Sequence, residues 1–419
     1  MKRTALSIVS FFIVLINVHA QDTDKVYSDV RQLYGVYYIN DFKDFESPDI
    51  PKGYVPVCIS HYGRHGARYQ DSEEAYTKVL DQLTKAREDN ALTEYGKEVC
   101  AKTEAFYALC KNHHGELTHV GWEQHKTIAR LMYSAYPRMF SKNAVVTANS
   151  SFSQRCMMSM TAFCVGLKEV APGLDLYAET SRTLLDETNP GDKQNINYVK
   201  TTQASSPWGM SYDEFLKTRI SSKEATDILL RIFTSEEYIK RNLSCIHYCQ
   251  SLYNMIAGMH CVNDELAIDD LFTESELFRF YEAINYGFFE WGALNKDKFK
   301  PIIKCMVRIA DEDMKGNHPS VRLRFGHDTN LLGILHLLNV DNLGIIPEDI
   351  NDLSKTWNCF MTPMAANFEL VLYRHKKSGN VLVLPLLNGK VVNIGVLPES
   401  GKVGKLYEWN DLKSFVDSL

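Results

Sequence analysis

The stretch that decides the fold runs from Tyr54 to Tyr69 and reads YVPVCISHYGRHGARY. Its first part, Tyr54 to Ser60, is a short apolar run of the kind that forms a buried strand. A cluster rich in glycine and arginine follows it, made of Gly63, Arg64, His65, Gly66, Ala67, Arg68 and Tyr69. Because ligands of α/β proteins bind at the carboxyl ends of strands, we expect chemistry at this point of the chain.

Outward from this strand, helical and strand-like patterns alternate, which indicates a layered α/β fold. Amphipathic helices are predicted over residues 76–109, 120–136 and 156–170, and strands over residues 143–147 and 174–178. Thr118 is the expected N-cap of the second of these helices. The alternation returns near the end of the chain, with strands at 321–325, 366–373 and 381–387 and a helix at 330–338.

The region between these two α/β parts has a different texture. Residues 186–296 lack strand patterns and contain acidic, aromatic and methionine-rich helical segments, such as 222–233 and 264–286. We therefore predict an α/β core built from residues 21–185 and 297–419, with a smaller inserted helical domain at residues 186–296.

Composition and charge set the class of protein. The chain has 419 residues, 45% of them hydrophobic and 23% charged, which is typical of a folded globular protein and excludes disordered and collagen-like classes. Its 46 basic and 52 acidic residues give a net charge of −6, so we expect no nucleic-acid partner. Any anion site must be local. The sequence carries no signal for an oligomeric state.

The first twenty residues have the pattern of a signal peptide. Lys2 and Arg3 precede an apolar run from Ala5 to Val18, and Ala20 stands before Gln21 at the expected cleavage point. A membrane-spanning helix needs about 20 apolar residues, and this run is shorter. We expect an exported protein, periplasmic or secreted, without a membrane anchor.

Cysteines are compatible with export but do not form a recognisable scaffold. Ten are scattered along the chain, and their spacing does not give a disulfide pairing. One cluster contains Cys245, His247, Cys249, His260 and Cys261, but its spacing matches no standard zinc site. We expect buried thiols or one local disulfide there, and no metal.

The residue types after the first strand favour phosphate chemistry. Arg64 and Arg68 flank His65, and arginine binds phosphate through two parallel, charge-assisted hydrogen bonds. A neutral imidazole attacks phosphorus to form a phosphohistidine, which divides one difficult displacement into two easier ones. From these residues alone, a solvated basic turn is the alternative interpretation.

Four segments together resemble the histidine acid phosphatases, the family that includes acid phosphatases, phytases and multiple inositol polyphosphate phosphatases. The RHGAR of Arg64 to Arg68 resembles the family's R-H-G-x-R signature. The other three segments, in the family's order, are LTHVG at 117–121 with Gln124, SQR at 153–155 followed by MSMTAF at 158–163, and GHDTN at 326–330. The closing strands, with PMAANFELVLY at 363–373 and LNG at 387–389, also resemble the family, so the match spans roughly residues 54 to 390. It implies a phosphoglycerate mutase-like α/β core with a helical domain beside it and the active cleft between them.

The resemblance also implies a role for each motif residue. His65 is the implied nucleophile, and Asp328 is the implied acid that protonates the leaving group. The implied phosphate-binding residues are Arg64, Arg68, Arg155 and His327. These cationic groups supply the charge that a metal ion supplies in other phosphoryl-transfer enzymes, so we expect no cofactor.

The aspartic acid raises the question of protonation. A free aspartic acid titrates near pH ~3.9, so we expect an acidic pH optimum if Asp328 is the proton donor. Capping of the helix that follows is the alternative role for Asp328.

Other histidines are weaker candidates. His61 lies four residues before His65, and His113 with His114 falls in a polar loop that could border the cleft. His125 and His336 fall within helical patterns, so we expect them to be packed or surface residues.

The substrate is less well specified by the motifs. Tyr69 after Arg68 resembles phytases and inositol polyphosphate phosphatases, but Gln70 stands where those proteins usually have proline. The His-Asp pair resembles phytases and acid phosphatases, whereas many inositol polyphosphate phosphatases have His-Ala-Glu. The nearest basic residues downstream of the motif are Lys78 and Lys85.

We therefore predict an exported histidine acid phosphatase that hydrolyses phosphomonoesters, with inositol polyphosphates such as phytate as a candidate class. One alternative is a phosphoglycerate mutase-like phosphotransferase, which the export signal and Asp328 oppose. The other alternative is a non-catalytic phosphate-ester-binding protein on the same scaffold, which the presence of both His65 and Asp328 opposes.

Overall fold

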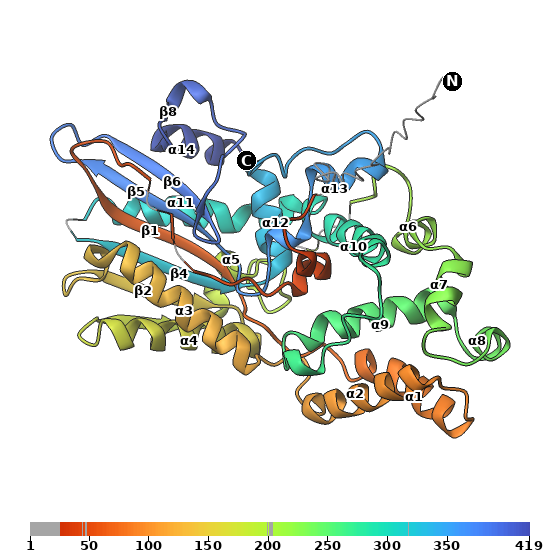
Figure 1. Cartoon of the computed structure of the whole chain (residues 1–419). Coiled ribbons are helices and arrows are strands. Elements are labelled where there is room, and N and C mark those ends of the chain that lie inside the picture. The colour runs from red at the N-terminus through yellow and green to blue at the C-terminus, as the bar shows by residue number, and fades with distance from the viewer. Residues whose placement is uncertain (1–25, 44, 47, 199, 201–203, 317) are drawn as a thin grey trace, which may run out of the picture.

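The computed structural model describes residues 26–419, apart from 44, 47, 199, 201–203 and 317 (Figure 1). The predicted signal peptide, residues 1–20, lies outside the described residues. Within the described ranges, no helix has both the length and the apolar character needed to span a membrane.

A mixed nine-stranded sheet forms the centre of the molecule, in the order β3-β2-β4-β1-β5-β6-β9-β8, with β7 paired to β6. Strands β3, β2, β4 and β1 run parallel, whereas β5, β6, β9 and β8 continue the sheet in antiparallel pairs. The strands are β1 (Tyr54–Arg64), β2 (Val145–Ser150), β3 (Leu176–Glu179), β4 (Ser320–Gly326), β5 (Asn367–His375), β6 (Val381–Leu387), β7 (Lys390–Val391), β8 (Lys402–Val403) and β9 (Leu406–Glu408). The predicted α/β class is confirmed.

Strand β1 is longer than its apolar run. The sequence predicts a strand over Tyr54 to Ser60, but the ladder with β4 continues to the pair Arg64 and Gly326. The last seven residues of β1 are buried, including polar His61 and Arg64. The strand predicted from hydrophobic residues ends too early, because the last part of β1 carries buried polar side chains.

Helices cover both faces of the sheet (Figure 1). Helices α3 (His119–Ala135) and α4 (Gln154–Val170) pack together, and α4 lies over β2 and β4. On the opposite face α11 (Lys300–Asp313) contacts β1, and α12 (Asp328–Leu337) follows β4. The predicted cap of α3 is present, because the Thr118 hydroxyl accepts a hydrogen bond from the Gly121 N–H at 3.2 Å.

A layer of helices stands beside the sheet (Figure 1). It consists of α1 (Glu74–Glu88), α2 (Glu94–Cys110), α6 (Tyr212–Arg219), α7 (Ser222–Leu229), α8 (Glu236–Asn242), α9 (Cys245–Met259), α10 (Glu274–Phe288) and the π-helical turn η5 (Phe289–Ala293). The predicted helix over 264–286 is interrupted, because Thr273 and Glu276 form a capping box that starts α10 anew.

The remaining helical elements lie between these segments of the chain and towards its two ends. They are η1 (Val30–Tyr37), η2 (Pro137–Phe140), η3 (Arg182–Leu184), α5 (Leu185–Thr188), η4 (Asp264–Leu266), η6 (Lys296–Phe299), η7 (Ile350–Asp352), α13 (Leu353–Thr356), η8 (Cys359–Met361), η9 (Glu399–Gly401) and α14 (Trp409–Ser418).

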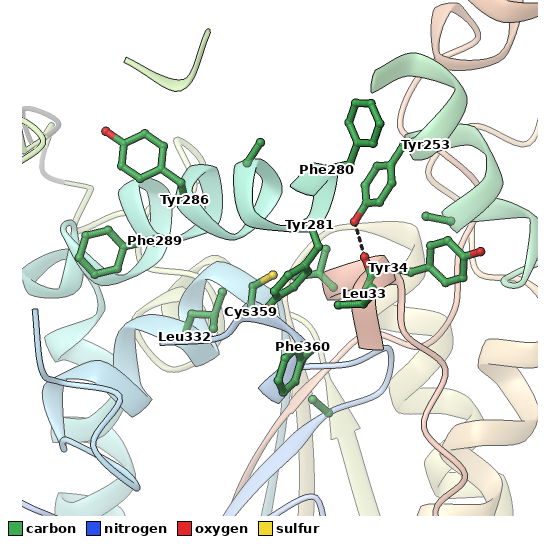
Figure 2. Packing of buried hydrophobic residues seen from close by; sticks show 14 of the residues in the cluster. Leu33, Tyr34, Tyr253, Phe280, Tyr281, Tyr286, Phe289, Leu332, Cys359 and Phe360 are labelled. Carbon is green, nitrogen blue, oxygen red and sulfur yellow. Dashed lines mark hydrogen bonds between the residues drawn. The ribbon is translucent and has the colours of Figure 1, made fainter. Parts of the chain in front are cut away.

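Aromatic side chains fill the core between the helical layer and the sheet. Figure 2 shows Tyr253 and Phe280 stacked, with ring centroids 5.7 Å apart, and the Tyr253 hydroxyl donating to the Leu33 carbonyl at 2.5 Å. The same buried cluster includes Leu331 of α12 and Phe368 of β5. One buried core therefore joins the helical layer to the sheet. The division that makes residues 186–296 a separate helical domain stays a prediction.

Each of the ten cysteines carries a free thiol, which agrees with the buried-thiol interpretation. In the cluster around α9, the histidines bind carboxylates: His247 Nε2 lies 2.6 Å from Asp213, and His260 lies between Asp264 and Asp269 at 2.5 and 2.9 Å.

Candidate active site

Three neighbouring parallel strands end at the same edge of the sheet. Strand β4 lies between β2 and β1, and the register places Gly326 beside Arg64 and Phe325 beside Ser150. The motifs after these three strand ends are therefore brought together, at the edge where ligand sites of α/β sheets occur.

Backbone hydrogen bonds to two other segments hold His65 in place. Its N–H donates to the Gly326 carbonyl at 3.0 Å, and its carbonyl accepts from the Ala365 N–H at 3.0 Å. The ring Nδ1 lies 2.9 Å from the Gly66 carbonyl oxygen, which can only accept, so this contact assigns the proton to Nδ1. The Nε2 lone pair is then free to act as a nucleophile.

The segment LTHVG with Gln124 supports the loop that carries His65. A Cβ at Gly66 would lie 2.5 Å from the Gly121 carbonyl, so the loop and the start of α3 approach as closely as backbones can. Gln124 Oε1 accepts from the Ala67 N–H at 2.9 Å, and the Thr118 hydroxyl donates to the Ala67 carbonyl at 3.0 Å. This segment has an architectural role.

Arg64 is fully buried and held by two distant segments. Its Nη1 donates to the carbonyls of Val36 and Thr362, at 2.5 and 2.7 Å. Its Nη2 lies 2.8 Å from Asp328 Oδ2. These contacts hold the guanidinium in one place before any ligand binds.

Arg68, from the loop after β1, and Arg155, from the first turn of α4, meet at Asp71. Arg68 Nη2 donates to Asp71 Oδ2 at 2.8 Å, and its guanidinium lies 5.4 Å from the centre of the Tyr37 ring. Arg155 Nη2 lies 3.9 Å from Asp71 Oδ1, and its Nη1 donates to the Gly115 carbonyl at 3.4 Å.

Each of the three arginines has a hydrogen-bond donor without a partner in the described part of the chain. The buried Nε of Arg64, Arg68 and Arg155 has no hydrogen-bond partner among the residues that the structure describes. Burial lowers the pKa of His65 well below its usual value, and the charges of Arg155, Arg64 and Arg68 lower it further. These effects favour the neutral form of the His65 ring, and the cations that act on it can bind an anion.

His327 follows the last residue of β4. A Cβ at Gly326 would lie 1.9 Å from the Tyr62 hydroxyl, so only glycine fits there. The His327 N–H donates to this hydroxyl at 3.4 Å, and His327 Nε2 lies 3.3 Å from Ser151 Oγ. Its ring centre is 5.7 Å from that of His65.

Asp328 begins α12, but it is not the residue that caps it. The N-cap is His327, and Asp328 uses Oδ2 to pair with Arg64 and Oδ1 to accept from the Thr329 N–H at 2.7 Å. Burial raises the pKa of Asp328, but the charges of Arg64, Arg68 and His327, with the Thr329 hydrogen bond, together lower it below its usual value. Without a ligand this carboxyl group is ionised.

Sequence reasoning missed several neighbours of these motif residues. Cys156 Sγ lies 3.9 Å from His327 Nε2, and although burial opposes it, His327 lowers the pKa of this thiol to about 7. The position of Cys156 directly after Arg155 was the available signal. For Tyr37, which lies under Arg68 and donates to Gln70 Oε1 at 2.6 Å, the sequence offers no local signal.

The other histidines lie elsewhere. His61 and His125 are buried near Phe325, whereas His113 is exposed and stacks on Tyr69 with ring centres 5.1 Å apart. His336 is buried and contacts the Leu343 carbonyl at 2.7 Å.

Known proteins provide an independent comparison. The family model of the histidine phosphatase superfamily (branch 2) matches residues 63–290. A search of the curated proteins finds no match.

Solved structures share the fold at low sequence identity. The apo multiple inositol polyphosphate phosphatase of Bifidobacterium longum is 19% identical, covers 92% of this chain and 97% of its own, and has a TM-score of 0.72. The phytase from D. castellii is 16% identical, with coverages of 93% and 85% and a TM-score of 0.66. The phytase from Citrobacter braakii is 12% identical, with coverages of 87% and 97% and a TM-score of 0.56.

The family match covers more than half of the chain and includes the loop of His65, and the fold agrees with that of the solved phosphatases. This chain belongs to branch 2 of the histidine phosphatase superfamily and is a phosphomonoester hydrolase.

Proposed function

We propose that this protein is an exported histidine acid phosphatase that hydrolyses phosphomonoesters through a phosphohistidine on His65. One observation carries the proposal: three arginines that lower the pKa of His65 also leave buried Nε donors without a partner in the described chain. A phosphate group satisfies such donors and matches their charge.

In the first step, the Nε2 lone pair of His65 attacks phosphorus and the bond to the ester oxygen breaks. Arg64, Arg68, Arg155 and His327 bind the non-bridging oxygens. Each hydrogen bond to a charged group contributes about 1.5–3 kcal/mol. Because these cations stabilise the transferred group, the reaction needs no metal ion.

Asp328 supplies the proton that the departing oxygen needs. Arg64 and Arg68 keep this carboxyl ionised in the free enzyme. A bound phosphomonoester brings up to two negative charges against the same arginines, so it raises the pKa of Asp328 toward protonation. The acidic optimum follows, since protonated Asp328 must be present when substrate is bound.

In the second step, the ionised Asp328 accepts a proton from water as the water oxygen attacks phosphorus. The bond between phosphorus and His65 Nε2 breaks, and inorganic phosphate leaves. Asp328 ends the cycle protonated, as it was in the enzyme–substrate complex.

Inositol polyphosphates are the substrate class that we propose within the phosphomonoesters. The support is the Arg68–Tyr69 pair and the likeness in fold to proteins named as phytases and a multiple inositol polyphosphate phosphatase. Gln70, which departs from the family pattern, has a structural role: its Nε2 donates to the Asn254 carbonyl at 2.9 Å and ties the loop to α9. Export, to the periplasm or outside the cell, rests on the pattern of residues 1–20.

The test is phosphate release between about pH 4 and 7 with a chelator present, from phytate and from p-nitrophenyl phosphate. Wild type should release phosphate from both, and His65→Ala from neither. A rapid alkaline quench, which preserves phosphohistidine, should trap labelled phosphate on wild type only. Release that a chelator abolishes, or that His65→Ala retains, would contradict the proposed mechanism.

A further inference from the structure

A cavity of about 360 Å³ opens beside Arg68, and two aromatic side chains, Phe288 and Trp291, form part of its wall. Trp291 is 56% exposed, and its ring meets that of Phe288 edge to face at 5.5 Å. The chemistry proposed above gives this aromatic pair no role. An exposed tryptophan in a cavity that reaches a phosphate-binding arginine is a candidate contact for substrate.

The backbone places Trp291 on the side of the proton donor. It lies in the π-helical turn η5, a rare conformation that often occurs at functional sites. A Cβ at the next residue, Gly292, would lie 2.9 Å from Leu332 Cβ and 3.5 Å from the Thr329 carbonyl oxygen. The turn that carries Trp291 therefore packs against the first turns of α12, which begins with Asp328.

Charges in this cavity are already paired. Arg68 lies 2.8 Å from Asp71, and Lys78 lies 2.9 Å from Glu74. All four line the cavity, and its other described lining residues carry no charge. Ion pairs are therefore poorly suited to hold the leaving group here, whereas the aromatic pair offers an uncommitted surface.

We infer that Phe288 and Trp291 bind the leaving group of the substrate through the face of a ring. This inference rests on the proposed function, because Asp328 marks the leaving-group side only if it is the acid. An aromatic ring stacks on an indole, and a cyclitol ring presents the C–H bonds of its chair to the same surface. The structure thus assigns the enzyme a preference for monoesters with a ring as the leaving group over monoesters with an open chain.

The experiment compares kcat/KM for p-nitrophenyl phosphate, which has a ring, with kcat/KM for glycerol 2-phosphate, which has none. Trp291→Ala should lower kcat/KM for the aryl ester about tenfold, and for glycerol 2-phosphate less than about twofold. Trp291→Phe should recover most of the loss. Each variant is compared with wild type on the same ester, so the intrinsic reactivity of the esters cancels.

The matched control is Tyr177→Ala, which removes another exposed aromatic side chain, 63% accessible, from strand β3 at the edge of the sheet. It should leave both esters unchanged. Equal losses on the two esters, or no loss on either, would overturn the inference while leaving the proposed function standing. Wild type that cleaves neither ester would count against the proposed function instead.

A binding measurement tests the aromatic pair without turnover. Phenylphosphonate and methylphosphonate should be titrated calorimetrically into wild type and Trp291→Ala. The phenyl compound should lose about tenfold in affinity, and the methyl compound should be unaffected. An equal effect on both compounds, or none, overturns the inference.

Discussion

Two buried regions of this molecule hold polar atoms without partners in the described chain, and they behave in opposite ways. The first is the arginine site, Arg64, Arg68 and Arg155, each with an unpartnered Nε. The second, here called the inner polar cluster, consists of His61, His125 and Glu369. In it, His61 Nδ1, both ring nitrogens of His125 and both carboxyl oxygens of Glu369 lack a hydrogen bond within the described residues.

The inner polar cluster lies where α3 and α4 meet the sheet: His125 belongs to α3, and the His61 ring of β1 contacts that of Phe163 in α4. His61 and Glu369 are register partners on β1 and β5, and the rings of both histidines lie within 5.6 Å of the Phe325 ring centre. Burial lowers the pKa of each histidine to about 3 and raises the pKa of Glu369 to about 8. Near pH 5 all three side chains are uncharged.

The difference shows what turns unpartnered polar atoms into a site. Arginine stays charged when buried, and one of the three, Arg68, borders an open cavity, so an anion can approach the site from there. The inner polar cluster gives up its charge and faces Phe163 and Phe325. A buried group that stays charged and borders a cavity indicates a ligand site. A buried group that becomes neutral lowers the stability of the fold.

Replacing the proposed nucleophile should have the largest effect. His65→Ala should lower kcat on the order of 10⁶-fold, as loss of a hydrolase nucleophile does. His61→Gln, four residues earlier and within β1, should keep kcat within about threefold, because His61 lies in the inner polar cluster. Initial rates on p-nitrophenyl phosphate measure both. Similar losses of kcat in the two variants would contradict the difference between the two regions.

Removing the proton donor should have the next largest effect. Asp328→Asn should lower kcat about 10²–10⁴-fold on glycerol 2-phosphate, whose alkoxide needs a proton to leave. The loss should be smaller on p-nitrophenyl phosphate, because nitrophenolate leaves without protonation. A loss that is the same on both esters would assign Asp328 to phosphate binding or to the placement of Arg64.

Glu369→Gln should change stability and not chemistry. Unfolded glutamate loses its proton above pH 4.5, while folded Glu369 keeps it up to about pH 8, so the stability of wild type falls as pH rises between these values. Glutamine does not titrate. The variant should therefore be more stable than wild type by on the order of 3 kcal/mol at pH 7, and the difference should vanish near pH 4. Thermal unfolding at several pH values measures this, and parallel pH curves would contradict it.

The two regions differ in how much of their arrangement the sequence predicts. Arg64, His65 and Asp328 sit in short local motifs after strands, and parallel strands bring such ends together, so their meeting was predictable. The support from Val36 and Tyr37 was not, since Val36 binds Arg64 from 28 residues away in sequence and Tyr37 packs on Arg68. Trp291 was hidden because aromatic residues in a helical pattern usually pack in the core.

The inner polar cluster was predictable only in part. His125 falls within a helical pattern, and packing was among its expected roles. Glu369 stands in an apolar strand, where the alternation alone does not tell which face is covered. The alternation of residues along a strand shows which side chains share a face. Whether that face is buried depends on helices from elsewhere in the chain.

His61→Gln should have the smallest effect, on stability in acid. The unfolded histidine binds a proton below about pH 6.5, whereas folded His61 stays neutral to about pH 3, so the stability of wild type falls as pH decreases between these values. The variant should gain on the order of 2 kcal/mol relative to wild type at pH 5 and nothing at pH 7.5. This slope opposes that of Glu369, so the double variant His61→Gln/Glu369→Gln should flatten the pH dependence from both sides. If the double variant kept the wild-type curve, neither His61 nor Glu369 would titrate as described, and the contrast between the two regions would not hold.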